Sequence, residues 1–469
     1  MIFRNLLGGI VLLTLVVPVD AVEIRLVVEE TIETVPSPHN GASPLWCYGS
    51  TILVRDGSEL YLSLLRPDEG YPPYCNAHWE LWRRDSGVWS ELHRGGEARE
   101  REPCPIGLLA KGEVVLSIQP AIMPKPFQDG HGDVPWVCQP GLFTINTGES
   151  GHEDRVYTDL HPVFPVGARF SQHSYRGLGV DRANRELLLM VIEQTDEHYQ
   201  PTWLDRNGQW HPLPLLEFPI RSCYPQVALK DGAAHVLAIG DIVEPVEAWR
   251  RAKFEVLNRE WDYAFRRLFY SWSSDLETNG FVEPIEIDSV DETAGSMRNL
   301  DLFIDGNGRA HLLYLKQNHQ YAFMRDRFFP GQPMTVSIEY AVVDQGQVIL
   351  RQTLFSGSAE EGGATDQDSM KLHLGRFHPL PDGHLGVVTS GSWRGGESRV
   401  ESGLFLSLLS DEGTVEQTIR LPAKRPFTGA FFTNTPRSGS DAGRHLDLIG
   451  AFSEADSHEM RYLGYELTK

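Results

Sequence analysis

The sequence has too few basic residues for several classes of function. Its 469 residues contain 42 Lys and Arg against 64 Asp and Glu, which gives a net charge of -22. Binding to nucleic-acid phosphates or to an anionic membrane surface needs a basic footprint. We therefore expect no nucleic-acid partner, although a local basic pocket remains compatible with an anionic small ligand.

Motifs for metal and nucleotide binding are also missing. No two of the five cysteines have the close spacing of a zinc site. The sequence contains no glycine-rich phosphate loop, no HExxH zinc motif and no EF-hand loop. The DGNG segment at 305–308 lies at a predicted hairpin turn and needs no calcium. We predict that the protein uses no metal and no cofactor.

Long hydrophobic runs are absent after the N-terminus. There, Arg4 precedes an apolar stretch from Leu6 to Val17, and small or aliphatic residues follow up to Ala21. This pattern predicts a secretory signal peptide over residues 1–21, cleaved after Ala21. The alternative is an uncleaved anchor, for which the run is short. We expect a secreted or periplasmic monomer without a membrane span.

Cysteines are few, but export would allow some of them to form disulfides. Four of the five fall in the first third of the chain that follows residue 21, which favours pairing among them. The odd number leaves at least one thiol free, and the connectivity stays open. The cysteines are Cys47, Cys75, Cys104, Cys138 and Cys223.

Helical patterns are scarce, and a β-hairpin pattern recurs instead. Seven times an apolar run enters a turn of Asp or Gly type and a second apolar run leaves it. A third strand and a second turn follow most of these hairpins, as in HWELWRRDSGVWSELH at 78–93. Seven four-stranded units predict an all-β, seven-bladed β-propeller as a single domain over residues 22–469. The first turns lie near Asp56, Gly112, Asp181, Asp231, Asp305, Asp382 and Asp441.

The two ends of this repeat array complement each other. The last unit has three strands and stops at RYLGYELTK, whereas the strand-like segment 22–35 belongs to no unit. We predict that this segment adds the outermost strand of the last blade and closes the ring, which removes an exposed edge. A frayed N-terminal arm is the alternative. Residues 244–267 fit a short exposed helix or a long loop equally well.

A candidate site follows from this architecture. The innermost strands of a propeller line its channel, so the residues that begin them should meet at one mouth, where a concave site forms. His173 and Tyr175 are two apart and would share one face of a strand. A base that takes the proton α to a carboxylate, with a cation beside it, could perform β-elimination. The residues that begin innermost strands are Trp46–Tyr48, Cys104, His173–Arg176, Cys223–Tyr224, Met297–Asn299 and Lys371–His373.

The second turns resemble the Asp-box turns of sialidase-type (BNR-repeat) propellers. The comparable residues are Asp85, Gly87, Trp89, Gly208, Trp210 and Asp275. Residues 172–203 and 223–241 resemble, more narrowly, the ulvan-lyase-like propellers among polysaccharide lyases, with His173, His198 and Tyr224 at matching positions. That resemblance implies that a His or Tyr abstracts the C5 proton of a uronic acid while an Arg or His neutralises its carboxylate.

We predict two sets of site residues. The catalytic set is His173, Tyr175, His198, Tyr224 and Arg298, and the substrate-binding set is Arg176, Arg250, His373 and Trp393. Trp393 is expected on an inserted loop, where its ring could stack on a sugar. The alternative for each residue is structural: a hydrogen-bonded His, a Tyr packed between blades, an Arg298 paired with Asp301.

Three functions remain open from the sequence. The first is an exported enzyme that acts on a polysaccharide, as an acidic-glycan lyase. The second is a propeller that binds a glycan or a protein without chemistry, because a fold alone does not decide function. The third is a sialidase-like glycoside hydrolase, although the sequence has no Arg-Ile-Pro segment.

Overall fold

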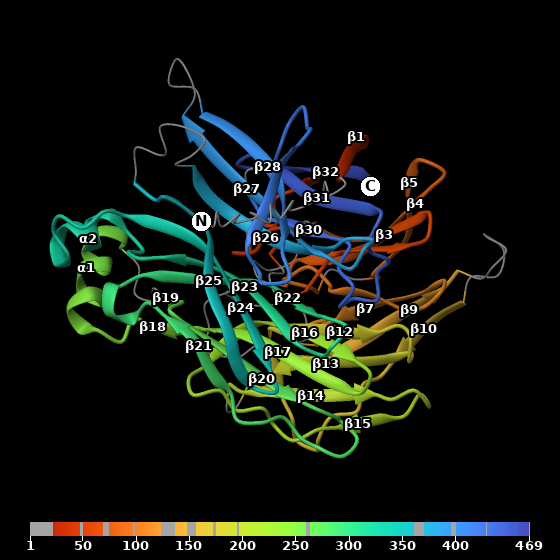
Figure 1. Cartoon of the computed structure of the whole chain (residues 1–469). Helices are drawn as coiled ribbons and strands as arrows, with labels where there is room; N and C mark the ends of the chain where they lie inside the picture. The colour runs from red at the N-terminus through yellow and green to blue at the C-terminus, as the bar shows by residue number, and fades with distance from the viewer. Residues whose placement is uncertain are drawn as a thin grey trace, which may run out of the picture.

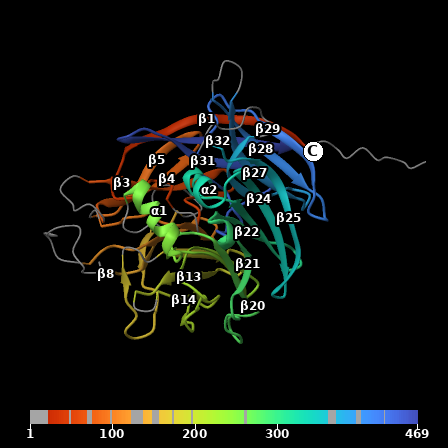
Figure 2. The same cartoon turned by 90° about the vertical axis from the view of Figure 1, so that its left-hand side faces the viewer.

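The chain is a ring of antiparallel sheets. In the computed structural model, the described residues form seven four-stranded sheets that follow one another as the blades of a β-propeller (Figures 1 and 2). The innermost strands contact one another in a closed cycle, which defines the central channel. This confirms the predicted fold. The described residues are 22–46, 50–68, 75–96, 99–122, 137–147, 156–171, 175–194, 197–258, 263–360, 370–394, 400–427 and 429–468.

Within blades 1 to 6, strands pair in chain order from the channel outwards. Blade 1 holds β2 (Leu53–Asp56), β3 (Glu59–Pro67), β4 (Ala77–Asp85) and β5 (Val88–Arg94). Blade 2 holds β6 (Ile106–Ala110), β7 (Glu113–Ile118), β9 (Gly141–Asn146) and β10 (Val156–Leu160). Blade 3 holds β12 (Arg176–Asp181), β13 (Glu186–Ile192), β14 (Tyr199–Leu204) and β15 (Trp210–Pro212).

The second half of the ring repeats this order. Blade 4 holds β16 (Ser222–Lys230), β17 (Ala233–Gly240), β20 (Arg267–Ser273) and β21 (Ile285–Ser289). Blade 5 holds β22 (Ser296–Ile304), β23 (Ala310–Gln317), β24 (Thr335–Asp344) and β25 (Gln347–Ser358). Blade 6 holds β26 (Lys371–Pro379), β27 (Leu385–Arg394), β28 (Val400–Leu409) and β29 (Val415–Leu421).

Blade 7 joins the two ends of the chain. It combines β30 (Phe431–Thr433), β31 (His445–Ser453) and β32 (Ser457–Thr468) with β1 (Glu23–Pro36) as the outermost strand. β1 pairs antiparallel with β32 from Glu23 opposite Thr468 to Pro36 opposite Ser457, and Figure 2 shows the two strands side by side on the rim. The predicted closure is therefore confirmed, and β32 has no free edge.

Strand burial explains why the repeats could be recognised. Every residue of β13 is buried, because neighbouring blades cover both faces of the middle strands. By contrast, β1 alternates between exposed and partly buried residues over its first half, as an outer strand does. Blades 3 and 4 approach closely at Gly177, where an added Cβ would stand 2.4 Å from the carbonyl oxygen of Pro225.

Aspartate side chains hold several of the turns. Asp205, between β14 and β15, accepts hydrogen bonds from the backbone N–H groups of Asn207 (2.9 Å) and Gln209 (2.8 Å). Asp305, between β22 and β23, makes the same two contacts with Asn307 (2.8 Å) and Arg309 (2.9 Å). Such side-chain contacts favour a tight turn, which is why Asp marks turns in the sequence.

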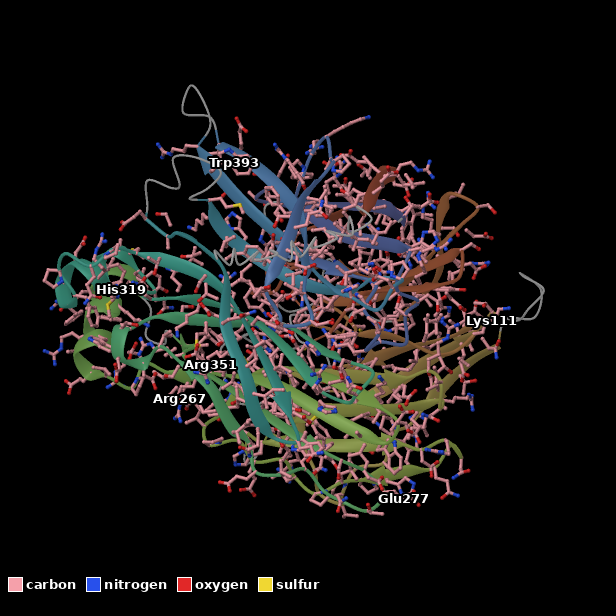
Figure 3. The ribbon with its side chains drawn as sticks, in the orientation of Figure 1. Lys111, Arg267, Glu277, His319, Arg351 and Trp393 are labelled. Carbon is pink, nitrogen blue, oxygen red and sulfur yellow. The ribbon has the colours of Figure 1, made fainter. Side chains whose placement is uncertain are left out.

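The insertions emerge on one face of the ring. We call this the entry face, because the innermost strands begin there; the opposite side is the exit face. Figure 2 shows both helices over the ring, and Figure 3 places His319 and Trp393 towards this side and Lys111 and Glu277 away from it. The inserted elements are β8 (Val137–Cys138), β11 (Phe170–Ser171), β18 (Ile242–Val243), α1 (Glu247–Leu257), β19 (Tyr263–Ala264), η1 (Asp291–Thr293) and α2 (Ala322–Phe328).

The seventh hairpin differs from the pattern. Instead of a tight turn near Asp441, residues 434–441 run into the channel as an irregular segment, which we call the channel segment. Its Ser438 carbonyl accepts from Leu108 N–H (2.8 Å), and its Arg437 carbonyl accepts from Val180 N–H (2.9 Å). Gly439 has φ +76°, and a Cβ there would lie 2.2 Å from the Leu108 carbonyl oxygen. These contacts with blades 2 and 3 draw the segment across the channel.

Two expectations concern the membrane. The predicted signal peptide, residues 1–21, lies outside the described residues. Among the helices that the structure describes, none is both long and apolar enough to cross a bilayer.

Candidate functional site

Six side chains gather where the innermost strands of blades 1 to 4 begin. We call them the entry cluster. Trp46 precedes blade 1, Glu102 precedes β6 and Tyr175 directly precedes β12. The other three come from blade 4, where Arg221 and Tyr224 lie at the start of β16 and Asp241 follows β17. The propeller thus brings together residues from four consecutive units.

A bulge in β16 sets the position of Tyr224. The pairing of β16 with β17 shifts register between Cys223 and Gln226, and Tyr224 has φ +51°. A bulky residue with positive φ is strained, and such strain persists only where surrounding structure holds it. Here the Asn299 side-chain amide donates to the Tyr224 carbonyl oxygen (2.7 Å). The strain is at the channel mouth, which is a position typical of functional residues.

The aromatic rings of the entry cluster pack against each other. The ring centroids of Tyr175 and Tyr224 are 4.7 Å apart, and Trp46 meets Tyr224 edge to face at 6.3 Å. Trp46 and Tyr175 are half-buried, and Tyr224 is at the limit of burial. Aromatic residues that are neither fully exposed nor fully enclosed offer a sugar ring an apolar surface with polar tips.

Arg221 organises the charges of blade 4. It forms an ion pair with the buried carboxylate of Asp241, and its Nε lies 3.2 Å from Glu197 Oε1. Its guanidinium also stands over the ring of Tyr175, 5.6 Å from the centroid. The guanidinium of Arg221 is therefore occupied by contacts within the protein, and it fixes Tyr175 and Asp241 relative to each other.

Glu102 is a carboxyl group of the entry cluster with a pKa near neutral pH. Burial raises the pKa of Glu102 to about 7, although Arg101 and Arg176 act in the opposite direction. Its side chain keeps 16% of its surface exposed, so it can still exchange protons with a ligand. A carboxyl group that is half protonated at neutral pH can serve as general acid or general base.

The two tyrosines are hydrogen-bond donors and remain in their neutral form. Burial is the largest cause that raises the pKa of Tyr175 and of Tyr224, and neighbouring negative groups such as Glu102 raise it further. Both phenols therefore stay protonated at neutral pH. In chemical terms they can hydrogen-bond to a substrate oxygen or to a leaving group.

Arg176 has a different environment from the one expected. It is buried at the start of β12, and its Nη2 lies 3.4 Å from Glu100 Oε2 and 3.5 Å from Cys104 Sγ. Its Nη1 lies 3.4 Å from Gln119 Oε1. Arg176 thus joins blade 2 to blade 3 beneath Glu102. It acts on the site through Glu102, because its positive charge lowers the pKa of that residue.

A basic group faces the channel mouth from blades 5 and 6. Arg298 on β22 and Lys371 on β26 are both exposed, and both act electrostatically on His373. Burial, with these two cations, lowers the pKa of His373 to about 4, so its ring is neutral at pH 7. His373 Nε2 lies 2.7 Å from Ser392 Oγ. We call Arg298, Lys371 and His373 the basic group; Asn299, next to Arg298, contacts the Tyr224 carbonyl oxygen and links the two clusters.

Three other predicted residues, His173, His198 and Arg250, are not members of the entry cluster or of the basic group. His173 lies outside the described residues. His198 is half-buried beside Glu197, and its Nδ1 is buried without a hydrogen-bond partner among the residues described. Arg250 is exposed on α1.

Trp393 lies on strand β27 and not on an inserted loop. It is 6% exposed, packs against Phe405 with centroids 6.4 Å apart, and has Arg420 over its ring at 5.4 Å. Neighbouring side chains therefore cover the Trp393 ring, which is consistent with packing within blade 6. Trp249 similarly lies under Arg266, 4.9 Å from the ring centroid.

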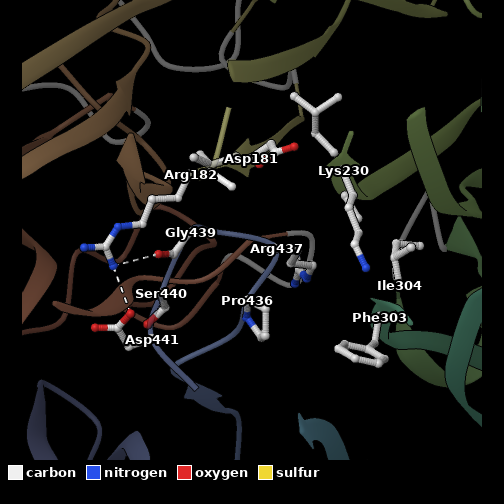
Figure 4. Close-up of a pocket in the computed structure, with 14 residues that line it drawn as sticks. Asp181, Arg182, Lys230, Phe303, Ile304, Pro436, Arg437, Gly439, Ser440 and Asp441 are labelled. Carbon is white, nitrogen blue, oxygen red and sulfur yellow. Dashed lines mark hydrogen bonds and ion pairs between the residues drawn. The ribbon is translucent and has the colours of Figure 1, made fainter. Parts of the chain in front are cut away.

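The exit face has an opening of another kind. A cavity of about 510 Å³ lies between the ends of β12, β16 and β22 and the channel segment, as Figure 4 shows. Its Arg182 contacts Asp56 and Asp441, and the Nζ of Lys230 donates to the Asp305 carbonyl oxygen at 2.6 Å. These cations are engaged, and Phe303 is the one aromatic residue among those that line the cavity, whereas three aromatic rings pack together at the entry face. The entry face is therefore the stronger candidate for the site.

In the part of the chain that the structure describes, no three His, Cys, Asp or Glu side chains are grouped so that they could hold an ion.

Sequence reasoning missed Glu102, Arg221 and Asp241. A positional signal was available: Glu102 and Arg221 each precede a cysteine of an innermost segment, Cys104 and Cys223, by two residues. Sequence spacing did not reveal their environment, because the burial of Glu102 depends on the folded ring and Asp241 pairs with Arg221 across the ends of two strands of blade 4.

Comparisons with known proteins add little to this description. No protein-family model and no curated protein matches the sequence. Among solved structures, an α-L-arabinanase of Penicillium chrysogenum has 12% identity and a TM-score of 0.43, with 94% of this chain and 98% of that chain covered. A sialidase of Trypanosoma rangeli has 10% identity and a TM-score of 0.37, with 82% and 59% covered. At these values no property of those proteins is transferred to this chain.

Proposed function

We propose that this propeller binds an acidic polysaccharide at its entry face and cleaves it by β-elimination. One observation carries the proposal: at one channel mouth, aromatic rings in contact and Glu102, whose pKa lies near neutral pH, adjoin a basic group that contains a neutral histidine. Aromatic faces suit sugar rings, and Arg298 and Lys371 suit a uronate carboxylate. A neutral polysaccharide would leave the two cations without a partner.

The residues can be assigned to the steps of elimination. Arg298 and Lys371 bind the carboxylate and so make the adjacent C5 proton more acidic. His373 removes that proton, and the electron pair forms the C4–C5 double bond as the C4–O bond breaks. Glu102 in its protonated form, with the phenol of Tyr224 beside it, returns a proton to the leaving oxygen.

Two readouts on one reaction test the proposal. The purified chain is incubated with uronate polysaccharides (polygalacturonate, alginate, hyaluronan, ulvan) and with neutral arabinan and galactan. Unsaturated-uronate absorbance and new reducing ends are then measured together. We expect both signals in equal molar amounts on at least one uronate polymer and neither signal on the neutral polymers.

Matched variants assign the reaction to the entry face. Glu102→Gln should lower kcat by about 10² to 10⁴-fold, the range for loss of a general acid. Arg298→Ala should lower kcat/KM on the uronate polymer. Glu277→Gln serves as the control, because Glu277 is exposed on the opposite side of the ring (Figure 3). Reducing ends without absorbance would contradict elimination and indicate hydrolysis, and glycan binding without either signal would indicate a binding platform.

A further inference from the structure

Two buried thiols from different blades lie in contact beneath the entry face. Cys75 immediately precedes blade 1's β4 region and is 1% exposed; Cys138 ends β8 in the insertion of blade 2 and is 4% exposed. Both cysteines are free thiols in the structure, and the contact with Cys75 is the largest influence on the Cys138 thiol. They are separated by more than sixty residues of chain, so their contact is a product of the fold and not of local sequence.

Backbone pairing holds both segments in place independently of the thiols. Ala77 exchanges hydrogen bonds with Glu100, with N···O distances of 3.1 and 2.7 Å. Ala121 N–H donates to the Arg99 carbonyl oxygen (3.0 Å), and Ala121 also forms a β-bridge with Cys138. Residues 99–100 therefore connect the segment of Cys75, through Ala121, to the segment of Cys138.

The other described cysteines have different neighbours. Cys104 Sγ lies 3.5 Å from Arg176 Nη2, and the Cys223 thiol contacts Asp241. Burial raises the pKa of Cys223 well above its ordinary value, and contact with Cys75 followed by burial does the same for Cys138. Thiols of this kind are poor nucleophiles and poor metal ligands, so a reactive or metal-binding role does not fit the pair.

We propose that Cys75 and Cys138 form a structural disulfide that joins blade 1 to the insertion of blade 2. The two thiols lose two protons and two electrons as the S–S bond forms. A disulfide oxidant, either an oxidoreductase or glutathione disulfide, accepts them and becomes two thiols. Because the pair is buried in the folded chain, the bond forms during folding, in an oxidising compartment of the kind that the predicted signal peptide would reach.

The disulfide would brace the wall behind the entry cluster. Residues 99–100 lie between the two linked segments, and Glu100 is the partner of Arg176 beneath Glu102. The proposal does not depend on the proposed enzyme activity, since it concerns the covalent structure of the chain.

Peptide mapping tests the bond directly. The full chain is refolded with glutathione disulfide, its free thiols are alkylated under denaturing conditions, and it is digested without reduction. We expect a peptide pair linked through Cys75 and Cys138, and alkylated Cys104 and Cys223. Alkylation of both Cys75 and Cys138, or a bond from either one to another cysteine, would overturn the proposal.

A stability measurement checks the result of the peptide mapping independently. A reductant should lower the melting temperature of the wild-type chain but leave that of the Cys75→Ser/Cys138→Ser variant unchanged. The Cys104→Ser variant should respond to the reductant as the wild type does. If the reductant affects the wild type and the double variant equally, the bond at 75 and 138 is not what it breaks.

Discussion

Arg55 provides the sharpest test of how the ring is held closed. It lies on β2 of blade 1, and its guanidinium makes a bidentate ion pair with Asp447 on β31 of blade 7, with distances of 2.6 and 2.7 Å. The Asp447 side chain is 1% exposed and also accepts a hydrogen bond from Tyr462 (2.7 Å). The pair therefore joins the first blade of the chain to the last one inside the protein.

Arg55→Met should be strongly destabilising, because it leaves the buried carboxylate of Asp447 without its positively charged partner. Two charge-assisted hydrogen bonds disappear, and breaking a buried pair from one side costs about 3–5 kcal/mol. The combined Arg55→Met/Asp447→Met/Tyr462→Phe variant removes the three polar side-chain groups together and should recover at least half of that loss, since replacing a buried ion pair with apolar residues is often neutral.

Guanidinium unfolding followed by tryptophan fluorescence measures both effects. The same m-value in all variants would indicate that they unfold from equally compact native states. A loss below about 1 kcal/mol for Arg55→Met, against the ~3–5 expected, would refute the reasoning that this pair is buried and unscreened. A triple variant as unstable as the single one would refute the claim that the stranded charge causes the loss.

Two further outcomes follow from the entry face. The pKa of Glu102 is raised to about 7 in the folded chain, whereas in the unfolded chain it lies at about 4. Between these two pH values the folded chain keeps a proton that the unfolded chain has released. The stability that Glu102 contributes is therefore complete below about pH 4 and is lost as the pH rises towards 7. Glu102→Gln should therefore be more stable than the wild type at pH 8, with no difference at pH 4, as measured by urea unfolding at both values; a difference independent of pH would contradict the raised pKa. Gly177→Ala should cost about 1–3 kcal/mol by overpacking against Pro225, and a thermal melt unchanged from the wild type would contradict the close approach of β12 and β16.

The sequence was sufficient for the architecture because the repeat is a local pattern. Each hairpin carries its own turn residues, such as Asp305, and its own run of buried residues, so the blades can be recognised one at a time. Closure by residues 22–35 followed from counting strands. The channel segment could not be predicted, because it depends on partners on other blades: the N–H groups of Leu108 and Val180 donate to the carbonyl oxygens of Ser438 and Arg437.

The candidate site was predictable only in part, for a related reason. Alignment on the turns correctly placed Tyr175, Tyr224, Arg298 and His373 at the entry ends of their strands. It could not show that Arg176 is engaged with Glu100 or that Glu102 is buried, because both properties depend on contacts between blades.

Hydrogen-exchange protection by a ligand tests the central claim most directly. The chain is compared with and without an oligouronate, and backbone exchange is followed in residues 222–226 and 296–299 at the entry face and in residues 436–441 at the exit face. The account predicts that the ligand slows exchange in the two entry segments and leaves the exit segment unchanged. Slower exchange at the exit face alone, or no change in any segment at saturating oligouronate, would contradict it.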